Sequence, residues 1–108
     1  MPPDRVGEFE QLVLMTVLRL GDRAYGATIR GDIADRTGRD ASLSAVYTTL
    51  ERLEQKKLLR ARIGEPTPRR GGRRKRYFTL SAAGERALQE SWQRFRRAAE
   101  GLEPLLER

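Results

Sequence analysis

Basic side chains, gathered in one stretch of the chain, are the residues best suited to bind a ligand. Between Arg60 and Arg76 there are eight basic residues and one acidic residue, whereas the rest of the chain carries 14 residues of each sign. Glycines and prolines interrupt this stretch, which predicts a cationic loop typical of a polyanion binder. The alternative is a solvated loop whose arginines reflect codon bias, since the chain has 19 Arg and 3 Lys. Codon bias would spread arginine over the whole sequence, so binding is favoured.

Sulfur and imidazole chemistry is excluded. The 108 residues include no cysteine and no histidine, which rules out disulfides, thiolate or imidazole metal sites, and catalytic triads with a histidine base. The carboxylates are scattered and form no visible acid–base pair. We therefore expect a protein that is not an enzyme and that needs no cofactor or metal.

Membrane insertion is not expected either. The longest apolar run, Leu12–Met15 followed after Thr16 by Val17 and Leu18, is much shorter than the roughly 20 residues of a membrane span. The first residues, Met1–Asp4, lack the basic and apolar regions of a signal peptide. We expect a cytoplasmic protein.

Three helices are predicted before the basic stretch. Glu8–Leu20 is apolar on most sides, so this helix must be buried on several of them. A four-residue repeat of apolar residues predicts a second helix from Ala24 to about Thr37, ended by Gly38. The third helix is expected to begin after a Ser42 cap and to continue to about Lys57.

The third helix has two distinct faces. Its predicted core stripe is Val46, Leu50 and Leu53. The opposite face carries Ser44, Thr48, Glu51, Arg52 and Gln55, with Ala45, Tyr47 and Thr49 on its flanks. The N-terminal half of that face is small, hydroxylated and free of negative charge, which suits entry into a DNA major groove. The alternative is an ordinary surface helix rich in Ser and Thr.

A β-hairpin is predicted after the third helix. Leu58–Ile63 and Lys75–Leu80 have the composition of strands, and the basic loop joins them. Three helices followed by a hairpin give a winged helix-turn-helix, a mainly α fold with a β-hairpin wing (α+β). The hairpin arginines are then expected beside the third helix, on phosphates or in the adjacent minor groove.

Two segments carry a family resemblance. They are Ser42–Glu54, with the sequence SLSAVYTTLERLE, and Gly71–Gly84, with the sequence GGRRKRYFTLSAAG. Together with Tyr25-Gly26 and Ile29, they resemble the PadR family of winged-helix transcriptional regulators, from about Gly7 to Leu106. The chain looks like the short subgroup, in which one C-terminal helix replaces a larger dimerisation domain. It departs from the family pattern at Lys57, where Gly is usual, and at Thr48, where Pro is frequent.

The predicted DNA-contacting residues lie on the third helix and in the hairpin: Ser42, Ser44, Tyr47, Thr48, Arg52, Arg73, Arg74, Lys75 and Arg76. Ser44, Thr48 and Arg52 are expected to read bases, and Tyr47 to brace a backbone contact. The hairpin cations are expected to contact phosphates.

The last predicted helix starts at a Ser81 cap and forms a C-terminal dimerisation helix. Its apolar residues recur at alternating steps of four and three, the spacing of a coiled-coil seam: Leu88, Trp92, Phe95, Ala99, Leu102 and Leu106. Pro104 is expected to bend or fray the end, so that the seam is secure to about Leu102. The alternative is a helix that folds back on its own domain. In PadR proteins this helix pairs with the first helix of the other subunit, which implies Phe9 and Leu12 at the interface.

Trp92 is the one tryptophan of the chain. Its default role is a core or interface anchor. The resemblance implies a second role, because some short PadR proteins accommodate planar aromatic compounds between their C-terminal helices. A small aromatic ligand is then expected at Trp92, Phe95 and Ala99, with Glu10 and Glu103 as candidate counter-ions.

These features predict a DNA-binding domain over residues 1–80 and a dimerisation helix over residues 81–108. The expected function is that of a homodimeric transcriptional regulator that binds double-stranded DNA, and the PadR resemblance implies a repressor relieved by a small molecule. The alternative is a basic RNA-binding or ribosome-associated protein, for which the arginine stretch alone would suffice. That alternative would not explain the coiled-coil spacing of the last helix or the hydroxyl-rich face of the third helix.

Overall fold

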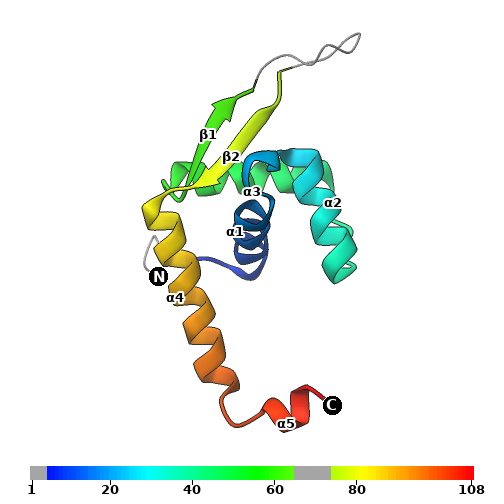
Figure 1. Cartoon of the computed structure of the whole chain (residues 1–108), viewed down its shortest axis with the longest axis vertical. Helices are drawn as coiled ribbons and strands as arrows, with labels where there is room; N and C mark the ends of the chain where they lie inside the picture. The colour runs from blue at the N-terminus through cyan, green and yellow to red at the C-terminus, as the bar shows by residue number, and fades with distance from the viewer. Residues whose placement is uncertain (1–4, 65–73) are drawn as a thin grey trace.

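The computed structural model describes residues 5–64 and 74–108. The elements follow one another as α1 (Glu8–Leu20), the short 3-10 helix η1 (Gly21–Arg23), α2 (Gly26–Thr37), α3 (Leu43–Gln55), β1 (Leu59–Ile63), β2 (Arg76–Leu80), α4 (Ala82–Ala99) and α5 (Glu103–Leu106). Helices α1, α2 and α3 form a body, from which the hairpin and α4 extend in opposite directions (Figure 1). The predicted fold, mainly helical with a hairpin wing, is confirmed.

The core lies between the three helices and the base of the hairpin. Its buried side chains come from these elements, from the segments that join them and from the first half of α4: Val13, Leu14, Val17, Ala24, Ile29, Ile33, Val46, Leu50, Leu53, Leu58, Leu59, Phe78, Ala87 and Leu88. The predicted stripe of α3, from Val46 to Leu53, is completely buried. The opposite face of α3 therefore points to solvent.

Both ends of α3 are closed by local hydrogen bonds. The Ser42 hydroxyl accepts from the Ala45 amide at 3.0 Å, as the cap prediction requires. At the other end, the Leu58 amide donates to the Leu53 carbonyl and the Lys57 amide to the Glu54 carbonyl, both at 2.9 Å. This pair of bonds is a Schellman motif.

Lys57 occupies the left-handed position of that motif, with φ 65°. The helix thus ends at Gln55, two residues before the predicted end. A lysine here carries a steric cost that glycine would not have, because its Cβ crowds the following carbonyl. The departure from the family pattern therefore leaves the turn intact but strained.

The hairpin is joined to the start of α2. Its strands pair antiparallel, with Leu59 opposite Leu80 and Arg62 opposite Tyr77. On the other edge of β2, the Phe78 amide donates to the Ala24 carbonyl at 2.9 Å, and Tyr25 forms a bridge with Tyr77. The segment before α2 is thereby bonded to the free edge of β2 in this two-stranded sheet.

Helix α4 leaves the body at the turn between α3 and β1. The Ser81 hydroxyl caps α4 by accepting from the Gly84 amide at 3.0 Å, and it donates to the Lys57 carbonyl at 2.7 Å. A Cβ on Gly84 would collide with the carbonyl of Leu58. Only glycine allows the first turn of α4 to approach this backbone so closely.

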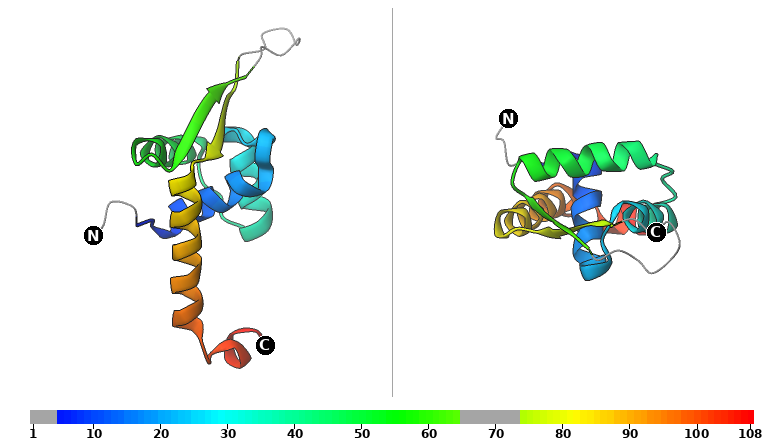
Figure 2. Two further views of the ribbon diagram at one scale, coloured as in Figure 1. Left: turned by 60° about the vertical axis from the view of Figure 1, so that its left-hand side comes forward. Right: turned by 90° about the horizontal axis from the view of Figure 1, so that it is seen from above.

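The outer end of α4 differs from the prediction. The helix ends at Ala99, and Gly101, with φ 85°, turns the chain into the separate α5. The sequence predicts a seam that is secure to about Leu102, but the helix ends three residues earlier, because Gly101 turns the backbone before Pro104 is reached. Figure 2 shows α4 projecting well beyond the body and α5 folding to one side. None of the described helices is long and apolar enough to cross a membrane.

Candidate nucleic-acid interface

The solvent face of α3 is the centre of the candidate interface. Ser44, Thr48 and Arg52 are all exposed, together with Glu51 and Gln55. They face away from the buried stripe, as the helical spacing predicts. The N-terminal part of this face has hydroxyl groups and no carboxylate, so phosphates and base edges could approach it without repulsion.

Tyr47 flanks this face and lies against α2. A Cβ on Gly26, the first residue of α2, would come within 2.6 Å of its ring. The Tyr47 side chain is nevertheless 43% exposed. Packing against a glycine fixes the ring beside the candidate contact face, as its predicted bracing role requires.

The basic residues Lys75 and Arg76, at the loop end of the paired strands, contact other parts of the body. The Lys75 ammonium lies 4.3 Å from the centre of the Tyr25 ring and donates to its hydroxyl at 3.3 Å. One Arg76 nitrogen lies 2.9 Å from both carboxylate oxygens of Glu54 on α3. Arg74 is exposed, and Arg73 lies outside the described residues. The ion pair of Arg76 ties the hairpin to the C-terminal half of α3.

Two further arginines lie on β1, on the hairpin face opposite to that of Arg76, and sequence reasoning placed them only in the basic stretch. Arg60 and Arg62 are exposed and lie opposite Thr79 and Tyr77 on β2. The Arg62 guanidinium lies 4.6 Å above the centre of the Tyr77 ring, a favourable cation–π distance. Their alternation with Leu59 and Ala61 was the signal that could have assigned them to one hairpin face.

Glu10 is buried at the junction of α1 and α3. Its carboxylate accepts from the Lys56 ammonium at 2.9 and 3.0 Å and from the Gly7 amide at 2.9 Å. Burial raises the pKa of Glu10, but these hydrogen bonds and the charges of Lys56 and Arg52 outweigh it, so that the pKa lies below its ordinary value. Because both Glu10 oxygens are bonded to Lys56, Glu10 cannot serve as a counter-ion for a ligand.

An apolar groove lies between α1 and α4. It has a volume of about 440 Å³ and is lined by Glu8, Gln11, Leu12, Met15, Trp92 and Phe95. The Trp92 and Phe95 rings are stacked 6.4 Å apart and are 50% and 62% exposed. A hydrogen bond of 2.8 Å from Ser91 to Gln11 holds the two helices together at this point.

The other predicted interface residues are distributed differently. Leu88 belongs to the chain's own core, and Phe9 is half-buried under the Arg39 guanidinium, 4.5 Å from its ring centre. Ala99 is half-buried at the end of α4, whereas Leu102 and Leu106 are exposed on the α5 segment. The six predicted seam residues, from Leu88 to Leu106, therefore do not lie on one helix.

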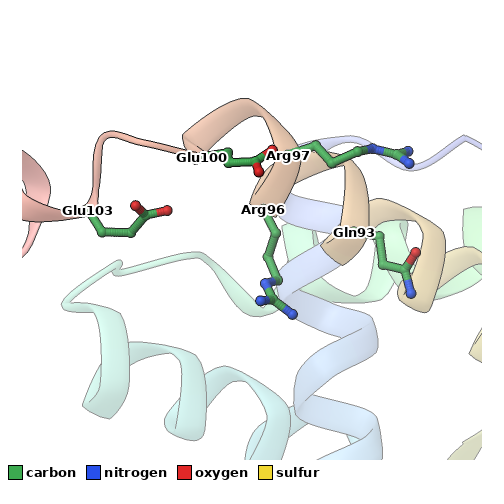
Figure 3. Close-up of a pocket in the computed structure, with 5 residues that line it drawn as sticks. All are labelled: Gln93, Arg96, Arg97, Glu100 and Glu103. Atoms are coloured by element: carbon green, nitrogen blue, oxygen red, sulfur yellow. The ribbon is translucent and has the colours of Figure 1, made fainter.

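A second hollow lies at the corner between α4 and α5. Charged and polar side chains line it: Gln93, Arg96, Arg97, Glu100 and Glu103 (Figure 3). Glu103 is a member of this polar corner and does not line the groove at Trp92. The acidic residue that lines the groove with the aromatic pair is instead Glu8.

A three-helix body with a hairpin beside the exposed face of its third helix defines a winged helix-turn-helix protein. Residues 14–90 match the model of the transcriptional regulator PadR-like family. The chain belongs to this family, as its sequence motifs predicted.

Solved structures of PadR regulators share the fold. One from Clostridium difficile is 22% identical, with a TM-score of 0.73 over 91% of this chain and 98% of that chain. One from Eggerthella lenta is 26% identical, with a TM-score of 0.69 over 90% of this chain and 82% of that chain. Bacillus subtilis PadR in complex with operator DNA is 21% identical, with a TM-score of 0.67; the match covers 79% of this chain but 46% of that chain. No curated protein matches this chain.

Proposed function

We propose that this protein is a sequence-specific DNA-binding repressor. The observation that carries the proposal is the exposed face of α3, whose N-terminal half has no acidic residue. The arginines of the hairpin lie beside it and add the positive charge that phosphate binding requires. Ser44, Thr48 and Arg52 read base edges, while the Ser42 hydroxyl, Tyr47 and the hairpin cations Arg73, Arg74, Lys75 and Arg76 contact the backbone.

Arg76 and Lys75 need not leave the body to act. Their contacts with Glu54 and Tyr25 support the loop end of the paired strands against the body. The operator complex of Bacillus subtilis PadR supports this use of the fold.

We further propose that the protein acts as a homodimer. Its body, residues 1–80, binds DNA, and residues 81–108 join two copies. The groove between α1 and α4 leaves Trp92 and Phe95 half-exposed or more, and Leu18 of α1 is 57% exposed. A second copy that covers this apolar surface would bury Leu12, Phe95 and Ala99, with Phe9 and the leucines of α5 at its rim. Two α3 helices could then enter successive major grooves about 34 Å apart.

A small planar ligand at Trp92 is proposed to relieve repression. The stacked rings of Trp92 and Phe95 offer a flat apolar surface, and the small side chain of Ala99 follows one turn further along α4. A ligand there shifts the spacing of the two DNA-binding bodies if it favours one dimer arrangement over the other. Titration with planar dyes should quench the fluorescence of Trp92 saturably, at one ligand per dimer. Trp92→Ala should abolish dye binding and spare DNA affinity; absence of saturable quenching across a broad panel would contradict this role.

Competition between nucleic acids tests the proposed function. Labelled duplex DNA bound to the full chain should be displaced by unlabelled duplex DNA at much lower concentrations than by structured RNA of equal length and charge. Equal or stronger competition by RNA would favour the RNA-binding alternative. A cytoplasmic location follows from the proposed action on bacterial-type promoters and is proposed with it.

A further inference from the structure

One carboxylate stands on the otherwise acid-free face of α3. Ser44, Thr48, Glu51 and Gln55 follow one another at steps of four, three and four, so they share a stripe roughly 60° wide at 100° per residue. All four are exposed, and the stripe lies opposite the fully buried Val46, Leu50 and Leu53. Glu51 therefore lies where a bound duplex would present its major groove.

The other carboxylates near α3 have partners within the chain. Glu54 is bonded through both oxygens to Arg76, and Glu10 through both oxygens to Lys56. Glu51 makes no ion pair within 4.0 Å with any residue of the described ranges. Its acceptor oxygens are thus open to a ligand that donates hydrogen bonds.

The chemistry of the groove restricts what Glu51 could accept. An ionised carboxylate is an acceptor only. The edges of guanine and thymine present acceptors, and adenine presents its amino group beside the acceptor N7, whereas cytosine presents the N4 amino donor. A carboxylate on this stripe therefore attracts cytosine and repels the other edges, so it also discriminates by rejection.

We propose that Glu51 is a specificity-determining residue that accepts a hydrogen bond from a cytosine amino group in the major groove. The proposal rests on the proposed DNA-binding function and names the base that one residue selects. The same charge lowers affinity for unrelated duplexes, because it adds repulsion against the phosphates without a compensating hydrogen bond. Glu51 thereby sharpens the preference for the operator in two ways.

Selection from a pool of randomised duplexes tests this role. The wild-type chain, Glu51→Gln and the control Glu90→Gln, which removes an exposed charge on α4, are each used to select duplexes. Every base pair of the selected wild-type site is then exchanged, and the affinity of each variant is measured. The wild-type and Glu90→Gln proteins should prefer C·G over the other pairs by about 10-fold or more at one position of each half-site. In Glu51→Gln this preference should be lost at that position alone, and affinity for unrelated duplexes should rise.

The outcomes separate this inference from the proposed function. A wild-type protein that selects no site contradicts sequence-specific DNA binding itself. If the wild-type protein selects a site, two results overturn the role of Glu51 alone. The first is a C·G preference retained by Glu51→Gln, and the second is an equal loss of affinity at every position, which indicates a purely structural role.

Discussion

The DNA-binding body and the C-terminal arm, α4 and α5, differ in how much of their apolar surface is buried. In the body, α1 to α3 and the hairpin enclose a core in which Phe78, Leu14 and Leu50 are at most 1% exposed. Every buried side-chain nitrogen and oxygen of the described residues has a hydrogen-bond partner. Beyond Ser91, the arm instead exposes Trp92, Phe95 and the leucines of α5. Clustered exposed apolar side chains are typical of an interaction site, and they are the basis of the proposed dimer.

The largest expected effect on stability comes from a substitution at Gly84, where α4 packs against the body. Gly84→Ala would press a methyl group against the Leu58 carbonyl, and we expect a loss of roughly 2–4 kcal/mol in the free energy of unfolding, since backbone must move. Gly31→Ala, on α2, is the matched control because no atom lies within 4 Å of its Cβ position. It should gain about 0.5–1 kcal/mol. Urea unfolding of both variants checks this; equal effects would contradict the close docking of α4.

The next largest effect is expected on dimer dissociation, from a substitution on the exposed apolar surface of the arm. Phe95→Ser removes an aromatic side chain that is 62% exposed in the single chain, so the body should keep its stability. If the groove joins two copies, the dissociation constant of the dimer should rise about 30-fold or more, as expected for a central aromatic anchor. Ile63→Ser, on the hairpin and 58% exposed, should leave it unchanged. Sedimentation equilibrium measures both, and an unchanged constant in Phe95→Ser would remove the arm from the interface.

The ion pair between Glu10 of α1 and Lys56, at the C-terminal end of α3, should depend on pH. Because the folded-state pKa of Glu10 lies below its ordinary value of 4.5, its contribution to stability is present above that value and is lost as the pH falls through the folded-state pKa. Glu10→Gln should lower the free energy of unfolding by about 1–2 kcal/mol at pH 7. The difference from wild type should shrink in acid. A difference that stays constant from pH 7 to pH 3 would contradict the ion pair.

The smallest expected effect is a gain in stability from a substitution at Lys57 in the body. Lys57 holds φ 65° at the end of α3, where glycine is free of the Cβ clash. Lys57→Gly should therefore stabilise the protein by about 1 kcal/mol. Lys57→Ala keeps the strain and removes the charge, so it should show no such gain. Thermal unfolding compares the two, and equal midpoints would show that charge, not backbone strain, matters at this position.

Local sequence signals predicted the body well. The spacing of Val46, Leu50 and Leu53 identified the buried side of α3, and the Ser42 and Ser81 caps are both confirmed. These features depend on residues a few positions apart, which periodicity and capping rules describe directly.

Long-range contacts of the site could not be read in the same way. The pairing of Arg76 with Glu54 joins residues 22 positions apart, and the pairing of Lys56 with Glu10 joins residues 46 positions apart. Each depends on how the helices pack, which the sequence pattern does not encode. In the arm, the a/d spacing continued past Ala99, but Gly101 and Pro104 ended the helix, because backbone geometry overrides the apolar pattern.

A footprint on the selected duplex tests the central claim most directly. The wild-type protein should bind with two chains per site and protect a pseudo-palindrome whose half-sites lie about 10 base pairs apart. Thr48→Ala should change affinity for that duplex at one base pair per half-site by about 1–3 kcal/mol, while binding to unrelated duplexes stays the same. Equal affinity for all duplexes, or an unsymmetrical footprint that Thr48→Ala leaves unaltered, would contradict a dimeric repressor that reads DNA through α3.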